Sequence, residues 1–138
     1  MKIYFGHSRM TYNTDAEERA IALIKKLIPE AEIVNPNIPE HQEGCWYSIE
    51  GEKLPGKEIG YFLRLSDPCD IGCFLQYYPD KWSAGSATEV NHMIAAGKRT
   101  FQINLEKERL DPIDEPVEAF TFEETLTKLS DAGITEYL

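Results

Sequence analysis

The chain has 138 residues and a formal net charge of −10, with 42% hydrophobic and 28% charged residues. A chain of this length can bury its own core, so we predict one domain over residues 1–138. The surplus of acid excludes a protein that wraps a nucleic-acid backbone, because that needs clustered Lys and Arg. It does not exclude one small anion held at a helix N-terminus. No stretch approaches the roughly 20 apolar residues of a membrane span, so we expect no membrane partner.

The cysteines indicate a compartment and argue against a metal. There are three of them, Cys45, Cys69 and Cys73, and the chain starts on a strand-like run in place of an apolar secretory leader. An odd number of cysteines without such a leader favours reduced thiols, and we expect a cytoplasmic protein. Cys69 and Cys73 have no second Cys or His pair at ligand spacing, so no metal site is predicted.

The first half of the chain alternates strand and helix signals. Residues 2–7 read as an apolar strand, and Thr14 with Glu17 forms a capping box for a helix to about residue 28. Residues 31–35 read as a second strand. The glycine- and proline-containing stretch 39–57 is predicted to be a long loop, and residues 56–65 a second helix.

The second half continues the alternation. Residues 70–78 are nearly all apolar, as in a parallel strand covered on both faces, and residues 86–96 read as the third helix. Residues 98–105 are predicted to be the fourth strand and residues 106–116 a charged loop. Ala119 begins a short fifth strand in this prediction, and the capping box of Thr121 and Glu124 opens a last helix to about residue 131.

This order of elements predicts an α/β fold, with a doubly wound parallel sheet of four or five strands. In such sheets ligands bind beyond the carboxyl ends of the strands. Two segments lie there in the prediction: residues 6–13 after the first strand and residues 79–89 after the third.

The second of these segments is the better candidate for chemistry. It reads Ser83-Ala84-Gly85-Ser86-Ala87-Thr88-Glu89, and small residues before a helix leave backbone N–H groups free to bind an anion. Glu89 then falls in the first turn of the predicted helix, where a carboxylate can attack an electrophilic sugar carbon. The same spacing also makes Ser86 and Glu89 a capping box, and both interpretations stay open.

Three stretches together resemble the nucleoside 2-deoxyribosyltransferase family. They are Ile3-Tyr4-Phe5-Gly6-His7-Ser8, then Asp70-Ile71-Gly72-Cys73-Phe74, and then Gly85-Ser86-Ala87-Thr88-Glu89 followed by Ala95-Ala96-Gly97-Lys98. The resemblance implies a flavodoxin-like, Rossmann-like fold and cleavage or transfer at an N-glycosidic bond. It further implies that Glu89 is the nucleophile, that no metal or organic cofactor is used, and that the protein is a homodimer or larger homo-oligomer.

One branch of that family hydrolyses deoxynucleoside 5′-monophosphates, and Ser8 and Ser83 match its two serines. Transferases typically have an aspartate in place of the second serine, and a hydroxyl can donate to a phosphate that a carboxylate would repel. The expected ligand is therefore a nucleoside or nucleotide. The predicted substrate-binding residues are Tyr4, Gly6, His7, Ser8, Arg9, Asp70, Ser83, Gly85 and Ser86. Three of these residues have alternative interpretations. Tyr4 could lie in the core, His7 could be part of a polar surface, and Arg9 could be a solvated charge.

A second function stays open beside the enzyme. After the glutamate the family usually has small residues where this chain has Asn91 and Met93. These two positions favour a non-catalytic nucleotide-binding or nucleotide-sensing module of the same fold. In the 39–57 loop, Trp46 and Tyr47 could stack on a base, anchor the loop to the core or form a dimer contact. Tyr77, Tyr78 and Trp82 ring the second segment and could form a wall of the pocket.

Overall fold

The computed structural model describes residues 1–55 and 59–135. They form one five-stranded sheet whose strands lie side by side in the order β2-β1-β3-β4-β5. The first four strands are parallel, and β5 pairs with β4 in the antiparallel sense. The strands are β1 (Lys2–His7), β2 (Glu32–Val34), β3 (Ile71–Leu75), β4 (Arg99–Asn104) and β5 (Arg109–Pro112). This is the flavodoxin-like strand order, so the predicted fold class is confirmed.

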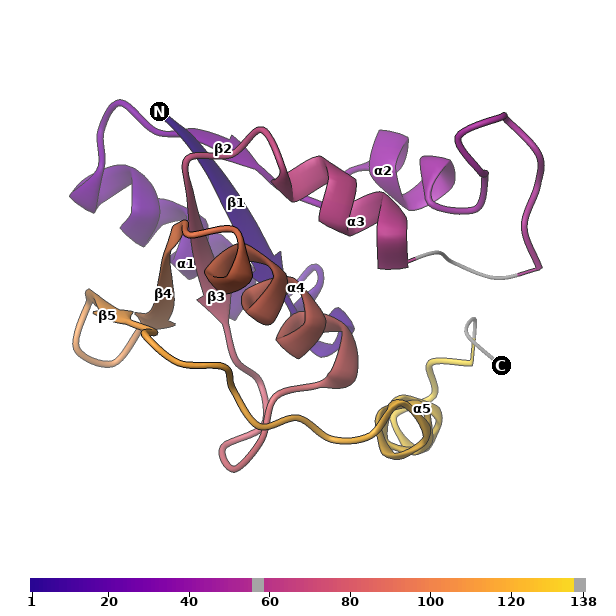
Figure 1. The fold of residues 1–138 in the computed structure, drawn as a ribbon. Helices are drawn as coiled ribbons and strands as arrows, with labels where there is room; N and C mark the ends of the chain where they lie inside the picture. The colour runs from indigo at the N-terminus through magenta and orange to yellow at the C-terminus, as the bar shows by residue number, and fades with distance from the viewer. Residues whose placement is uncertain (56–58, 136–138) are drawn as a thin grey trace.

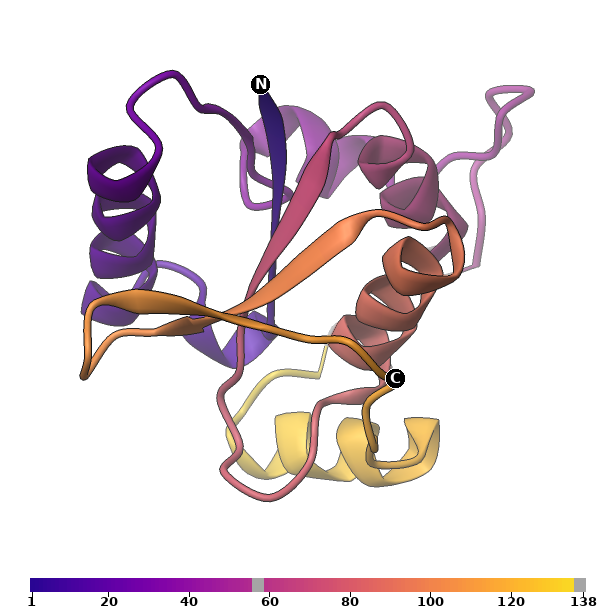
Figure 2. The same ribbon diagram turned by 60° about the vertical axis from the view of Figure 1, so that its left-hand side comes forward.

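Helices cover both faces of the sheet (Figure 1, Figure 2). They are α1 (Asp15–Leu27), α2 (Pro39–Gly44), α3 (Ile59–Ser66), α4 (Ala84–Ala95) and α5 (Phe122–Asp131), with a short 3-10 helix η1 (Arg9–Thr11) after β1. Alternation along β1 divides the core in two, because successive side chains of a strand point to opposite faces. Phe5 packs with Leu23 and Ile24 of α1, whereas Tyr4 packs with Val90 and Met93 of α4.

Several predicted boundaries change in the structure. The predicted loop 39–57 contains the helix α2, which has Pro39 in its first turn, where a missing N–H costs nothing. The predicted charged loop 106–116 contains β5, and Ala119 forms only an isolated bridge with Trp82. Charged side chains are tolerated on β5 because it is an edge strand. The start of the predicted second helix, residues 56–58, lies outside the described residues.

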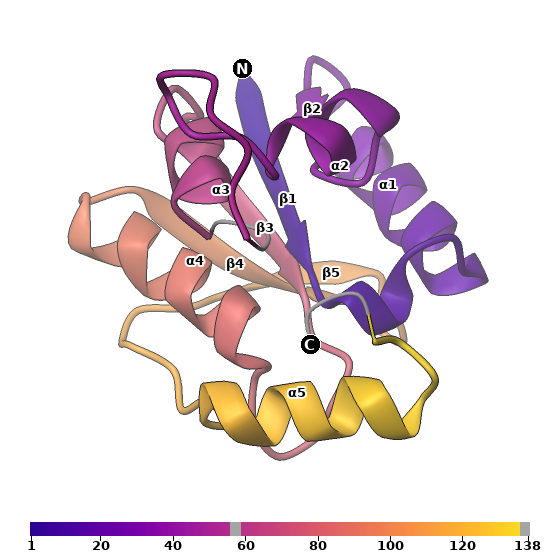
Figure 3. The same cartoon turned by 90° about the vertical axis from the view of Figure 1, so that its right-hand side faces the viewer.

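The last helix occupies a position that the alternation of elements did not predict. Its capping box is present, with Thr121 and Glu124 bonding each other's backbone N–H groups. Instead of packing on a face of the sheet, α5 runs across the end to which β1 and β3 point (Figure 3). Backbone bonds from Trp82 N to Glu118 O and from Phe120 N to Trp82 O attach the segment before α5 to the segment before α4. The carboxyl end of the sheet is therefore covered by α5.

Among the described residues, no helix is both long enough and apolar enough to cross a membrane.

Candidate functional site

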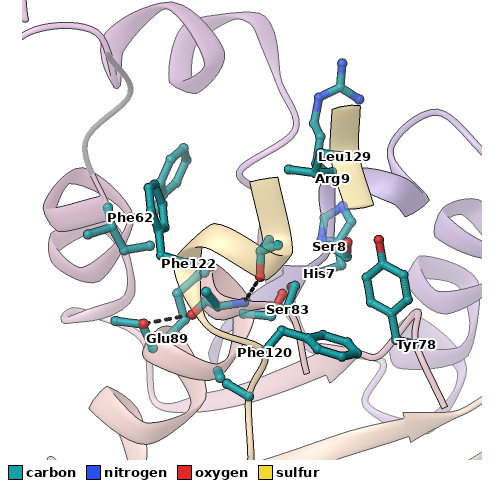
Figure 4. A pocket seen from close by; sticks show the side chains of 18 of the residues that line it. His7, Ser8, Arg9, Phe62, Tyr78, Ser83, Glu89, Phe120, Phe122 and Leu129 are labelled. Atoms are coloured by element: carbon teal, nitrogen blue, oxygen red, sulfur yellow. Dashed lines mark hydrogen bonds between the residues drawn. The ribbon is translucent and has the colours of Figure 1, made fainter. Parts of the chain in front are cut away.

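A cavity of about 620 Å³ lies at the carboxyl ends of β1 and β3, where the strand order reverses. This reversal is the usual ligand position in a doubly wound sheet. The loop after β1, the first turns of α4, the start of α3 and one side of α5 line the cavity. Figure 4 shows labelled side chains from these four segments around the same space.

Glu89 lines this cavity from the second turn of α4. The helix begins at Ala84 with Ser83 as its N-cap, two residues earlier than predicted, so Glu89 is too far along to cap it. Only 7% of Glu89 is exposed, and one carboxylate oxygen accepts a hydrogen bond from the hydroxyl of Tyr4. The capping-box interpretation of Ser86 and Glu89 is therefore wrong, and the placement of Glu89 in the first turn is wrong as well.

Burial sets the ionisation of this pair. Loss of solvent raises the pKa of Glu89 to about 8, and the hydrogen bond from Tyr4 acts in the opposite direction by stabilising the carboxylate. The pKa of Tyr4 is raised well above its usual value, first by its own burial and then by the charge of Glu89. Tyr4 therefore remains a neutral donor at any physiological pH.

The start of α4 presents polar groups to the cavity. Ser83 has the extended backbone of an N-cap, but its side chain makes no capping hydrogen bond. Ser83 and Ser86 are 8% and 4% exposed, and both line the cavity together with Gly85. The Ala84 N–H donates to the hydroxyl of Thr125 in α5, at 3.0 Å. This helix terminus thus offers hydroxyl groups to an anion, and one of its backbone donors already has a partner in α5.

The loop after β1 forms the other polar side of the cavity. His7, Ser8 and Arg9 all line it. The Ser8 hydroxyl accepts a hydrogen bond from Met10 N at 3.2 Å, which leaves its own proton available to a ligand. The Arg9 guanidinium lies 5.1 Å from the centroid of the Tyr12 ring. His7 is buried, and both of its ring nitrogens contact oxygen atoms of the protein.

Three predicted site residues do not line the cavity. Tyr4 lies beneath it and reaches it only through Glu89. Gly6 serves packing, because a Cβ there would lie 2.3 Å from a ring carbon of Phe74. The carboxylate of Asp70 accepts a hydrogen bond from Lys2 N at the amino end of β3. Five strand residues, roughly 16 Å, separate Asp70 from the cavity end of that strand, so the structure does not bring it to the site.

An aromatic and aliphatic wall lines the rest of the cavity, and the sequence interpretation found only Tyr78 of it. It comes from the start of α3, the loop after β3 and the segment ending in α5: Ile59, Phe62, Tyr78, Phe120, Phe122, Leu126 and Leu129. The only signal for the part in α5 was the apolar stripe of that helix, which reads equally well as a core-facing surface. Trp46 and Tyr47, predicted as stacking candidates, line a separate small hollow with Glu43 and Lys53.

The lining of the cavity is partly polar and partly aromatic. Among the described residues, no group of three or more His, Cys, Asp or Glu side chains lies close enough to hold a metal ion. The cavity instead combines hydroxyl groups on one side, aromatic rings on another and a single buried carboxylate.

No model of a known protein family matches the chain, and no curated protein matches it either. A solved structure described as a conserved protein from Enterococcus faecalis V583 is similar at 20% sequence identity and a TM-score of 0.45. The similarity covers 74% of this chain and 62% of that chain, so the chain spans less than two thirds of the other protein's length.

Proposed function

We propose that the protein cleaves or transfers at the N-glycosidic bond of a (deoxy)nucleoside or its 5′-monophosphate, with Glu89 as the nucleophile. The observation that carries the proposal is the position of Glu89. Its carboxylate is buried, faces the cavity at the switch point of the sheet, and is held by the hydroxyl of Tyr4. A carboxylate held in this way is prepared to attack a carbon that develops positive charge.

The proposed reaction has two balanced steps. A Glu89 oxygen forms a bond to the anomeric carbon while the bond from that carbon to the base nitrogen breaks. The base leaves with the electron pair and takes up one proton from solvent. Water or the nitrogen of a second base then attacks the same carbon, which releases Glu89 as a carboxylate and one proton to solvent. Tyr4 donates to the carboxylate in its free form and so orients the attacking oxygen.

The two sides of the cavity fit the two ends of a nucleotide. Ser8, Ser83 and Ser86 offer hydroxyl donors at the start of α4 and in the facing loop, which suits a 5′-phosphate. The aromatic wall, with Tyr78 and Phe120 among its members, suits a flat base. Local donors are needed here because the protein as a whole carries a charge of −10.

A specific observation favours the alternative, a non-catalytic nucleotide-binding module. With a pKa near 8, Glu89 is mostly protonated at neutral pH in the ligand-free protein, and a neutral carboxyl is a poor nucleophile. In such a module Glu89 would act as a hydrogen-bond donor to the ligand. Turnover therefore separates the two functions directly.

The test is a panel of nucleosides, deoxynucleosides and their 5′-monophosphates, monitored for release of free base, with a second base added as acceptor in a parallel series. The proposal expects base release with at least one member of the panel. Glu30→Gln is a matched control for substitution of Glu89, because Glu30 is an exposed acid outside the cavity. Binding of a nucleotide without release of base from any member would replace the enzyme by the binding module.

A further inference from the structure

Glu17 is a buried carboxylate that the proposed reaction does not use. It is the third residue of α1, where the capping box predicts contact with the backbone of Thr14. Thr14 does cap the helix through its hydroxyl, but the Glu17 side chain turns elsewhere. Only 7% of Glu17 is exposed, whereas its neighbours Asp15 and Glu18 are exposed.

The Glu17 carboxylate gathers donors from three separate segments. It accepts from Asn13 N at 3.2 Å and from the Asn37 side-chain amide at 2.8 and 3.1 Å, and it lies 2.6 Å from His7 Nε2. These partners come from the loop after β1, the segment after β2 and the end of β1. A buried carboxylate requires such partners, since burial of an unpaired charge is costly.

His7 has no ring nitrogen left for a ligand. Its Nδ1 lies 3.1 Å from the Phe5 carbonyl, which can only accept, so Nδ1 carries a proton. Its Nε2 lies 2.6 Å from a carboxylate oxygen of Glu17, so this nitrogen also has a partner within the protein. The ring is stacked on Phe5, with 4.0 Å between centroids, and Tyr12, its other titratable neighbour, is tilted against it at 4.8 Å. Burial lowers the pKa of His7, and the hydrogen bonds to Glu17 and to the Phe5 carbonyl act in the opposite direction.

The network holds both ends of the loop that carries Ser8. His7 precedes Ser8 directly, and Asn13, at the far end, has a left-handed backbone with φ of 60° that its bond to Glu17 supports. Inside the loop the Ser8 carbonyl accepts from both the backbone and the hydroxyl of Thr11. We propose that Glu17, with His7 and Asn37, is a positioning residue that fixes the Ser8 loop at the edge of the cavity, and that His7 is neither an acid nor a phosphate donor.

This inference rests on the proposed function only for the identity of the ligand. A loop held in its binding conformation loses less entropy when a phosphate binds, so the network contributes to affinity without touching the ligand. Two variants test this role. Glu17→Ala removes the group that Asn13, Asn37 and His7 all contact. Glu17→Gln keeps an amide oxygen for Asn37 and Asn13 and an amide N–H for His7. Glu18→Ala is the control for loss of an acid in the first turn of α1.

The first arm needs no ligand. Nitrogen-15 NMR of the His41→Asn, His92→Asn protein leaves His7 as the single histidine. We expect a protonated Nδ1 at every pH from 5 to 9 and no free-imidazole titration curve. Amide exchange of residues 8–13 should be faster in Glu17→Ala and nearly normal in Glu17→Gln. A freely titrating His7, or unchanged exchange in Glu17→Ala, would overturn the proposal.

The second arm measures the affinity for deoxyadenosine 5′-monophosphate and for inorganic phosphate by calorimetry. Glu17→Ala should weaken nucleotide binding about tenfold, and Glu17→Gln and Glu18→Ala should stay within about threefold of the wild type. Equal weakening by Ala and Gln would contradict positioning. If Glu17→Ala does not fold, Asn37→Ala takes its place with a smaller loss expected. Failure of the wild type to bind either probe would count against the proposed ligand, while the first arm would still decide the role of the network.

Discussion

The hydroxyl of Tyr4 donates a hydrogen bond to the carboxylate of Glu89, although 85 positions separate the two residues in the chain. The bond joins the middle of β1 to the second turn of α4 beneath the cavity. Both side chains are buried, so the pair is at once part of the core and the floor of the candidate site.

The burial of Glu89 predicts an unusual dependence of stability on pH. Folding raises the pKa of Glu89 from 4.5 to about 8. Between these two pH values Glu89 is protonated in the folded protein and ionised in the unfolded chain. The free energy of unfolding should therefore fall as the pH rises from about 4.5 to 8. Glu89→Gln cannot ionise and should equal the wild type near pH 5 but exceed it at pH 9, by up to about 5 kcal/mol. Thermal melts of both proteins across this range measure the difference, and parallel curves would contradict it.

Removal of the Tyr4 hydroxyl should shift the pH dependence of activity. The hydrogen bond lowers the pKa of Glu89, so Tyr4→Phe should raise that pKa further. A hydrogen bond to a charged group contributes about 1.5–3 kcal/mol, which corresponds to roughly one to two pH units. The rising limb of the rate of base release should move to higher pH by that amount. Tyr77→Phe is the control, since Tyr77 is 49% exposed and does not line the cavity; an unmoved limb in Tyr4→Phe would exclude the coupling.

The phosphate side of the cavity predicts a preference that one substitution reverses. A deoxynucleoside 5′-monophosphate should bind more tightly than its nucleoside, because Ser8 and Ser83 line the polar side. Ser83→Asp should bind the nucleoside more tightly than the nucleotide through charge repulsion. Calorimetry with both ligands on both proteins measures these affinities. Equal affinities in the wild type would contradict a phosphate site and favour a transferase that acts on nucleosides.

Assembly remains a separate prediction. The family resemblance implies a homodimer or larger homo-oligomer, and the acidic surface allows it, since interface cores are depleted in charge. Light scattering should give at least twice the mass of one chain, 15.8 kDa, at micromolar concentration. A monomer at high micromolar concentration would contradict the prediction.

The sequence predicted the sheet better than the site. Apolar runs and capping residues located β1, α1, β3, α4 and α5, because local periodicity and helix ends are written in neighbouring residues. The position of α5 across the carboxyl ends depends on long-range contacts such as Thr125 with Ala84, which no local pattern contains. For the same reason every member of the aromatic wall except Tyr78 was missed.

The predicted site residues also differ in how well the sequence placed them. Ser8, Ser83 and Glu89 follow directly from their place beyond strand ends, and all three line the cavity. Asp70 was carried over from the resemblance alone, and it lies at the amino end of its strand. His7 lines the cavity as expected, but its contact with Glu17 could not be deduced from two residues ten positions apart.

Glu89→Ala is the decisive variant for the role of Glu89 as the nucleophile. We predict that the folded variant loses essentially all base release, because no covalent intermediate can form, and keeps nucleotide affinity within about tenfold, which is about 1.4 kcal/mol. The measurement is the rate of base release by wild type and variant, with a thermal melt and calorimetry on the same samples. A folded Glu89→Ala protein that releases base at a near-normal rate would show that Glu89 is not the nucleophile.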